Sequence, residues 1–238
     1  MTINQQIENW LASRKTTFEF ENRPFVTLSY AQSWDGSITT RTGETLALSG
    51  AESTRLTHQL RSLHDGILVG IGTVLTDDPQ LTVREWTGAN PQPIVLDSHL
   101  RMPPNARLCQ HSDKNCWIFT SLNDDSDFGN QVEIITMEGD NEGRVNLQHA
   151  LGLLWEKGIK MLMVEGGSQV ITAFLKAQLA DALVLTIAPT LIGGYKGVGN
   201  LGITSKQQLP KIRPLYSQML EDDLIMWGDL QYQEPALS

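Results

Sequence analysis

An unbroken apolar run at residues 161–164 leads directly into a carboxylate, Glu165, and two glycines, Gly166 and Gly167. Four consecutive apolar residues are typical of a strand that is buried on both faces. After the glycines, apolar residues return at helical spacing, and Ser168 stands where it could cap a helix. The stretch therefore predicts a buried strand, a tight turn and a helix.

The glycine turn has two interpretations. Because they have no side chains, Gly166 and Gly167 would let a ligand's phosphate approach the backbone N–H groups of the helix, whose dipole favours an anion there. The alternative is a tight strand-to-helix connection with no ligand. Glu165 favours the first interpretation, since α/β sheets place ligands at the carboxyl ends of their strands.

The alternation of strand and helix is predicted along most of the chain. Strands are predicted at residues 24–31, 66–71, 93–97, 116–120, 132–136, 161–164 and 181–188. Two final strands, at residues 215–220 and 224–230, are predicted to form a hairpin. We therefore expect an α/β fold, with a mostly parallel central sheet flanked by helices and antiparallel C-terminal edge strands. Residues 1–22 are predicted to be an N-terminal helical extension, and residues 23–238 a single domain.

Local signals describe one helix and one loop in more detail. Ser49 and Glu52 have the spacing of a capping box, with Ser49 at the N-cap. Three polar residues are expected to lie off the buried leucine stripe of the helix that follows: Arg55, His58 and Arg61. The glycine-rich segment 192–201 is predicted to be a flexible surface loop.

Composition limits the partners and the compartment. The chain has 238 residues, a net charge of −9 and a pI of about 5.0, which argues against a general nucleic-acid or acidic-membrane surface. Its two cysteines, Cys109 and Cys116, suggest no disulfide framework and favour a reducing, cytoplasmic setting. The N-terminus lacks the long apolar core of a signal peptide, and no apolar run approaches the length of a membrane span.

Common ligand motifs are incomplete in this sequence. Gly70-Ile71-Gly72 follows a predicted strand, but Leu75 stands where a dinucleotide-binding fingerprint has its third glycine. Segment 193–197 lacks the Gly-Lys-Ser/Thr ending of a P-loop. The five histidines are scattered without metal-ligand spacing, so we expect no metal site.

Arginines near a predicted turn indicate a phosphate site. Thr73 and Asp77 precede a break at Pro79, Arg84 follows it, and Arg61 lies one helix earlier. A guanidinium suits phosphate because its planar fork makes two parallel charge-assisted hydrogen bonds. The alternative is a solvated surface helix and loop, which is the commoner place for any single arginine.

Taken in order, these motifs resemble the riboflavin-biosynthesis pyrimidine reductases. The matching segments run from about residue 24 to 230 and are Ser33-x-Asp35-Gly36, Gly43-Glu44, Arg61, Thr73-x-x-x-Asp77-Asp78-Pro79-x-Leu81-Thr82-x-Arg84, Asp97-Ser98, Val164-Glu165-Gly166-Gly167, Leu179-x-Asp181 and Pro189-x-Leu191-x-Gly193-Gly194. The resemblance implies a dihydrofolate reductase-like fold. It also implies an enzyme, usually dimeric, that uses NADPH to reduce the ribose of a phosphoribosylamino-pyrimidine to a ribityl chain.

The resemblance implies roles for individual residues as well. The substrate would be held by Thr45, Arg61, Leu81, Arg84 and Glu165. The dinucleotide would be held by Ala31, Ala47, Thr73, Asp77, Ser98, Gly167, Ser168, Gln169, Val170, Ile171, Thr172 and Ala173. Glu165 would orient the substrate or serve the proton path that accompanies hydride transfer, while the protein supplies alignment.

Two departures from the family leave alternatives open. The chain has no zinc deaminase motif upstream, so it would be the reductase alone. Ala47 stands where many bacterial members have a tryptophan beside the cofactor. One alternative is another dihydrofolate or pteridine reductase on the same fold, for which a phosphate clamp at Arg61 and Arg84 would have no use. The other is a non-catalytic member that binds the dinucleotide.

Overall fold

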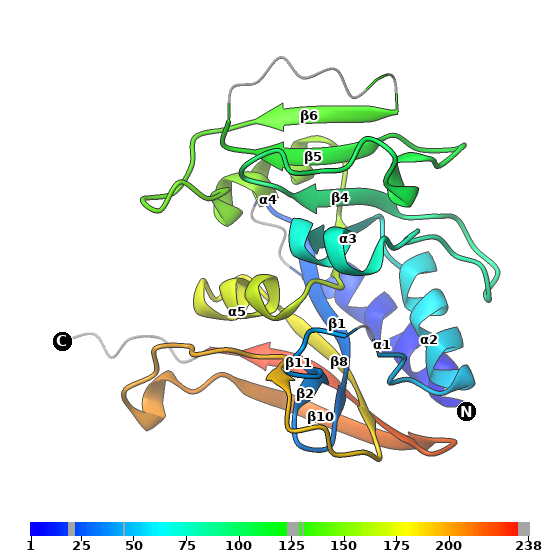
Figure 1. The fold of residues 1–238 in the computed structure, drawn as a ribbon. Helices are drawn as coiled ribbons and strands as arrows, with labels where there is room; N and C mark the ends of the chain where they lie inside the picture. The colour runs from blue at the N-terminus through cyan, green and yellow to red at the C-terminus, as the bar shows by residue number, and fades with distance from the viewer. Residues whose placement is uncertain (19–21, 45, 123–128, 130, 233–238) are drawn as a thin grey trace.

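The computed structural model describes residues 1–238 except 19–21, 45, 123–128, 130 and 233–238 (Figure 1). Its described part contains a nine-stranded sheet with the order β10-β11-β8-β1-β7-β3-β4-β5-β6. The strands of this sheet are β1 (Phe25–Ser33), β3 (Gly66–Gly70), β4 (Gln92–Leu96), β5 (Cys116–Thr120), β6 (Val132–Thr136), β7 (Met161–Val164), β8 (Ala182–Ala188), β10 (Lys211–Leu220) and β11 (Asp223–Gln231). A separate short sheet pairs β2 (Ser37–Thr39) with β9 (Tyr195–Lys196).

The strand directions confirm the predicted fold class. Every neighbouring pair from β8 across to β6 is parallel. Strand β11 is antiparallel to β8, and β10 is antiparallel to β11, so the last two strands form the predicted hairpin at one edge. The chain is therefore an α/β protein with a mostly parallel sheet and antiparallel C-terminal edge strands.

Helices cover both faces of the sheet. Their bounds are α1 (Ile3–Thr17), α2 (Ala51–Ser62), α3 (Ile71–Asp77), α4 (Leu147–Glu156) and α5 (Ser168–Lys176), with short 3-10 helices at Arg107–Cys109 and Lys206–Gln208. Figure 1 shows α1 and α2 on one side of β1 and α5 on the other. Met161 and Met163 of β7 pack with α1 and α2, whereas Leu162 and Val164 pack with α4 and α5. Strand β7 is apolar at every position because both of its faces are covered.

Helix α1 confirms the predicted N-terminal helix but ends earlier than expected, at Thr17. Ile7 and Trp10 are buried in the cluster that also contains Met161 of β7. The Trp10 indole donates a hydrogen bond to Asp229 of β11 at 3.2 Å, and Arg14 forms an ion pair with the same carboxylate at 2.6 Å. Helix α1 therefore packs on the same core as the sheet.

Two predicted helix caps are wrong. Gly50, not Ser49, is the N-cap of α2, and its N–H donates to Asp223 Oδ2 at 2.8 Å. Gly167 is the N-cap of α5, so Ser168 lies inside the helix. For α2 the reason is tertiary, because a carboxylate from the C-terminal hairpin meets the N–H that opens the helix.

The prediction that three polar residues of α2 lie off its buried side is only partly confirmed. Arg55 is exposed, but His58 and Arg61 are buried. The backbone of the segment after α3 packs against both of them, through Thr82 and Arg84. A helical pattern alone does not reveal this second covering element.

The parallel arrangement brings several connections to one edge of the sheet. Strands β1, β3, β4, β7 and β8 all end there, and each is followed by polar or glycine-rich residues. This is the edge where α/β sheets bind ligands. None of the helices in the described ranges has both the length and the apolar character needed to cross a membrane.

Candidate active site

A two-point ion pair joins α2 to the end of β7. Arg61 Nε donates to Glu165 Oε1 at 2.7 Å, and Arg61 Nη2 donates to Glu165 Oε2 at 2.8 Å. The two side chains are only 11% and 15% exposed. Burial alone would lower the pKa of Arg61, but the charge and hydrogen bonds of Glu165 outweigh that effect. The net result is a raised pKa, so Arg61 stays protonated. The pair fixes the carboxylate at the carboxyl end of β7.

The segment from Leu81 to Arg84 lies against this pair. Leu81 is buried and has a positive φ of 57°, which turns the chain sharply. The Thr82 carbonyl accepts a hydrogen bond from Arg61 Nη1 at 2.9 Å, and the Thr82 hydroxyl accepts one from Arg84 Nη1 at 2.8 Å. Partial burial, followed by the charge of Arg61, lowers the pKa of Arg84. Arg61, Leu81, Arg84 and Glu165, four of the residues that the resemblance assigns to the substrate, thus lie close together.

The glycine turn packs closely against α3. The Gly167 N–H donates to Thr73 Oγ1 at 3.2 Å, which joins the start of α5 to α3. A Cβ added to Gly70 or to Gly166 would lie 2.6 Å from Val170 side-chain atoms. Both glycines are therefore required by the close approach of α5. This agrees with the alternative that the turn is a tight strand-to-helix connection. The Thr73 contact also places two predicted dinucleotide residues side by side.

The remaining predicted dinucleotide residues differ in what they contact. Ser98 Oγ accepts the Val145 N–H at 3.0 Å, and Thr172 Oγ1 accepts the Gly199 N–H at 2.8 Å. The Ile171 side chain is fully buried in the core, so it secures α5 to the sheet. The other positions are only located by the structure: Ala31 is half-buried in β1, Ala47 and Gln169 are exposed, Ser168 and Ala173 are half-buried in α5, and Asp77 ends α3. Thr45 lies outside the described residues.

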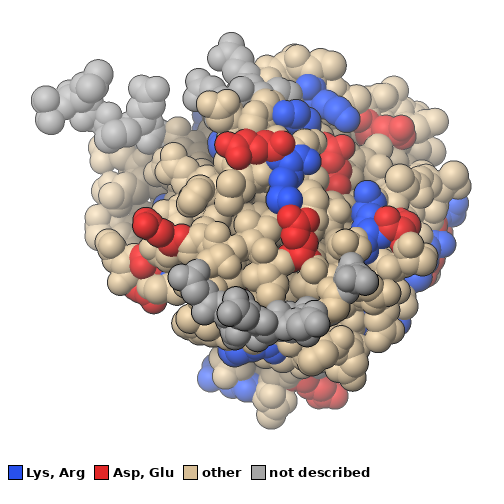
Figure 2. Space-filling model, turned by 90° about the horizontal axis from the view of Figure 1, so that it is seen from above, with Lys and Arg blue, Asp and Glu red and all other residues tan. Residues whose placement is uncertain are grey.

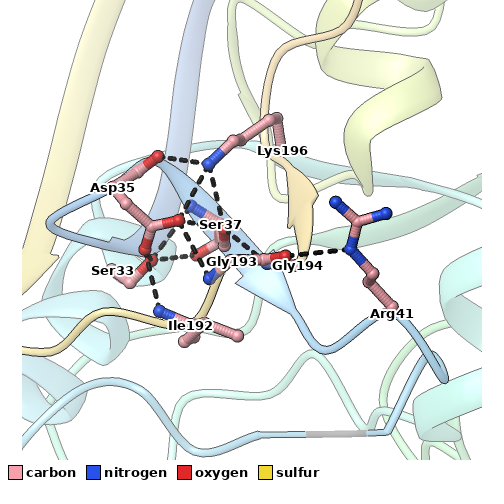
Figure 3. A network of polar contacts seen from close by, with 8 residues as sticks. All are labelled: Ser33, Asp35, Ser37, Arg41, Ile192, Gly193, Gly194 and Lys196. Carbon is pink, nitrogen blue, oxygen red and sulfur yellow. Dashed lines mark hydrogen bonds and ion pairs between the residues drawn. The ribbon is translucent and has the colours of Figure 1, made fainter.

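A polar network around Asp35 was not identified from the sequence (Figure 3). Asp35 Oδ1 accepts hydrogen bonds from Ser33 Oγ at 2.6 Å and the Ile192 N–H at 2.9 Å. Asp35 Oδ2 accepts from the Gly193 N–H at 3.0 Å and from Lys196 Nζ at 2.8 Å. These donors, Lys196 first, hold the pKa of Asp35 well below its usual range. The spacing Ser33-x-Asp35 after a strand was the available signal.

The same network contradicts the expectation of a flexible loop at residues 192–201. Part of the segment forms β9, and the Gly194 N–H donates to Ser37 Oγ at 3.0 Å. A Cβ on Gly194 would lie 1.8 Å from the Thr39 carbonyl oxygen. Gly194 is therefore required because the two backbones touch. Segment 192–201 contacts Asp35 at one end, through Ile192, and Thr172 near the other, through Gly199. It therefore links the end of β1 to α5.

Comparison with known families decides what kind of chain this is. Residues 24–226 match the family model described as the RibD C-terminal domain. The chain belongs to the RibD C-terminal domain family. The match extends over nearly the whole sheet and includes both arginines, Glu165 and the glycine turn.

Individual relatives of this chain point the same way. The riboflavin biosynthesis protein RibD of Aquifex aeolicus is 34% identical over 217 residues, 89% of this chain and 59% of that protein. The chain therefore spans less than two thirds of that relative. The 2,5-diamino-6-ribosylamino-4(3H)-pyrimidinone 5′-phosphate reductase of Methanothermobacter thermautotrophicus is 35% identical over 213 residues, 86% of this chain and 97% of that protein.

Solved structures share the architecture of this chain. The riboflavin biosynthesis reductase Rib7 of Saccharomyces cerevisiae superposes with a TM-score of 0.79 at 27% identity, covering 96% of this chain and 99% of that one. RibD of Acinetobacter baumannii has the same fold, with a TM-score of 0.79 at 22% identity over 94% of this chain and 62% of that one.

The surface charges of the domain are mixed. Figure 2 shows basic and acidic side chains interleaved on the face seen from the β6 end. Among the described residues, no group of three or more His, Cys, Asp or Glu side chains is placed to hold a metal ion. The cations of the site are instead Arg61 and Arg84, which meet at Thr82.

Proposed function

We propose that this chain reduces the ribose of a ribosylamino-pyrimidinone 5′-phosphate to the ribitylamino product, with NADPH as the hydride donor. The main support is the Arg61–Glu165 ion pair beside Arg84. The Thr73–Gly167 contact lies in the same turn after β7, two residues beyond Glu165. This arrangement offers an anchored carboxylate, a cation for a phosphate and a glycine turn for a dinucleotide at one sheet edge. The reductases named among the relatives support the same reaction.

We assign the substrate to Thr45, Arg61, Leu81, Arg84 and Glu165. Arg84 is the more exposed arginine and has donors left to meet the 5′-phosphate, whereas Arg61 already gives three N–H groups to Glu165 and Thr82. Arg61 therefore orients Glu165, while Arg84 binds the phosphate. Leu81 shapes the turn that carries Arg84.

We assign the dinucleotide to the start of α5, to Thr73, which contacts it, and to Asp77 and Ser98. The fit rests on the turn itself, since the N-cap Gly167 has no side chain to cap the first-turn N–H groups of α5, where the helix dipole favours phosphate. When bound, NADPH would supply the hydride that reduces C1 of the opened sugar. Glu165 holds the sugar in line, and its carboxylate stabilises the protonated nitrogen of the ring-opened imine, so that hydride addition to C1 gives the neutral amine.

The test is the loss of reduced-nicotinamide absorbance when the purified chain is mixed with NADPH and substrate. The aminated and the deaminated ribosylamino-pyrimidine phosphates are supplied separately, and oxidation with one of them identifies the substrate. Glu165→Gln is expected to lower kcat about a hundredfold, because it removes the negative charge that stabilises the protonated imine. The matched control is Glu133→Gln on β6, which removes the charge that Glu133 shares with Lys157 at the end of α4. NADPH binding without oxidation of either compound would overturn the proposed activity.

We further propose that the active form is a homodimer paired through β10. This strand is at the edge of the large sheet and exposes Leu215, Tyr216 and Met219. Arg213 lies near one end of β10 and Glu221 follows the other, so antiparallel pairing of two copies brings opposite charges together. Met219→Lys is expected to give a monomer in light scattering. Leu209→Lys, an exposed leucine outside β10, should not.

The remaining assignments complete this proposal. Residues 23–238 form the reductase domain, and the N-terminal helix adds to its core through Ile7 and Trp10. We place the reaction in the cytoplasm, which agrees with Cys109 and Cys116 both being free thiols.

A further inference from the structure

His58 is buried beside the proposed site, yet no role in the reaction is assigned to it. It lies on α2, three residues before Arg61, and is 2% exposed. Its Nδ1 accepts a hydrogen bond from the Arg84 backbone N–H at 3.0 Å. Only an unprotonated Nδ1 can accept this bond. Burial, followed by the positive charges of Arg61 and Arg84, lowers the pKa of His58 and keeps that nitrogen unprotonated at neutral pH.

Three consecutive residues of the Arg84 segment each have one backbone group held by a side chain. Arg61 donates to the Thr82 carbonyl at 2.9 Å, and Asn90 Oδ1 accepts the Val83 N–H at 2.8 Å. His58 accepts the third group, the Arg84 N–H. Two of these anchors come from neighbouring turns of α2. The helix that orients Glu165 through Arg61 thus also orients Arg84 through His58.

We infer that His58 is a positioning residue for the reaction, which fixes the backbone of Arg84 and so the direction from which its guanidinium reaches the substrate phosphate. The inference rests on the proposed function, because it assigns the phosphate to Arg84. The Arg84 guanidinium itself is tied to the Thr82 hydroxyl at 2.8 Å, a contact within its own segment. Without the His58 contact, the Arg84 backbone would be less fixed, and the guanidinium would no longer be directed at the phosphate.

The test is a double-mutant cycle between His58 and Arg84, read as KM for the phosphorylated substrate. His58→Leu removes the acceptor at similar size and is expected to raise KM about tenfold, the effect of one lost positioning hydrogen bond, with a smaller fall in kcat. In an Arg84→Met background the same change should raise KM less than about twofold. An equal rise in both backgrounds would overturn the inference, because His58 would then act without Arg84.

Two amide variants separate positioning from general support of the fold. In His58→Asn the amide Oδ1 can occupy the place of the imidazole Nδ1, whereas in His58→Gln the acceptor lies one bond further out. His58→Asn should recover KM to within about threefold of the wild type, and His58→Gln should not. The comparison remains decisive even where His58→Leu fails to fold. Equal KM values for the two amide variants would contradict the inference.

Failure of the proposed function gives a different result. A wild-type chain that oxidises no NADPH with either phosphate would remove the proposed reaction before His58 is altered. Binding of the phosphorylated substrate, measured by calorimetry, then still tests the link between His58 and Arg84. NADPH affinity is the internal control, since Thr73 and Gly167 do not contact His58 in the described hydrogen bonds.

Discussion

Arg61 and Glu165, 104 positions apart in the sequence, share two hydrogen bonds of 2.7 and 2.8 Å in a largely buried ion pair. Bidentate geometry fixes the plane of the carboxylate as well as its position. The pair restrains the side chain of Glu165. Its backbone is held as well, because the Glu165 N–H continues the sheet by donating to the Leu68 carbonyl. The pair therefore sets both the stability of this edge and the direction of the carboxylate.

Replacing Arg61 by methionine should destabilise the fold, because the Glu165 carboxylate would be left without its charged partner. We expect the free energy of unfolding to fall by about 3 kcal/mol, measured by urea denaturation. Arg55→Met on the same helix is the control. Arg55 is exposed and lies 3.9 Å from Glu52, so its loss should cost less than about 1 kcal/mol. Equal losses would show that the Arg61 pair contributes nothing specific.

Gly166→Ala should displace α5, since the new methyl group would lie 2.6 Å from Val170 Cβ. We expect a loss of about 1–3 kcal/mol in stability, together with weaker NADPH binding in a fluorescence titration. Adding Val170→Ala should recover part of the affinity by making room. In α3, Gly72→Ala meets no atom within 4 Å and should be neutral or stabilising by up to about 1 kcal/mol. Normal NADPH affinity in Gly166→Ala would contradict this account.

The stability of the fold should decrease in mild acid because of His64. Its ring contacts the Leu60 carbonyl at 2.7 Å and Thr27 Oγ1 at 2.9 Å, and burial lowers its pKa from 6.5 to about 4. The unfolded chain therefore takes up the proton first. Stability is full above pH 6.5 and falls as the pH drops towards 4, by at most about 3 kcal/mol at 1.4 kcal/mol per unit.

Urea denaturation at several pH values measures this loss. His64→Gln should flatten the dependence between pH 6.5 and 4, because glutamine does not titrate. His149→Gln, at an exposed position of α4, should leave it unchanged. A wild-type curve that is level across this range would refute the assignment to His64.

Asp35→Asn should release the segment that contains β9. The carboxylate accepts the Ile192 and Gly193 N–H groups, and the variant loses the charge that attracts Lys196. These two amides should exchange their hydrogens faster in the variant, measured by NMR. Because the pKa of Asp35 is lowered, its contribution is present above the unfolded value of about 4 and is lost only as the pH falls through the folded value. Asp140→Asn, in a separate turn, should not change these amides.

Much of the fold could be predicted because its signals are local. The run 161–164 and the hairpin of β10 and β11 show in their sequence patterns, and both are confirmed. The N-caps of α2 and α5 could not be predicted from local patterns, which favoured Ser49 and Ser168. The N–H that opens α2 is met by Asp223, a residue 173 positions further along the chain. No local pattern encodes such a partner.

The site divides in the same manner. Glu165 stands out because a carboxylate follows a buried strand, and Arg84 stands out because it belongs to an ordered set of motifs that resembles a known family. His58 does not, since its importance depends on which backbone group arrives opposite its ring. That group belongs to Arg84, 26 positions away, and it arrives only when the intervening strand and helix have packed. The family resemblance predicts the ligand residues, whereas the side chains that position them are seen only in the folded structure.

Val170 fills the space left by the missing side chains of Gly70 and Gly166. Three segments consequently share one volume: the ends of β3 and β7 and the first turn of α5. A designer who moves this turn into another sheet must transplant all three positions together, because a valine without both glycines collides and glycines without the valine leave a void. The smallest portable unit of this site is therefore the segment 166–170 together with Gly70 from a distant part of the chain, rather than the continuous segment alone.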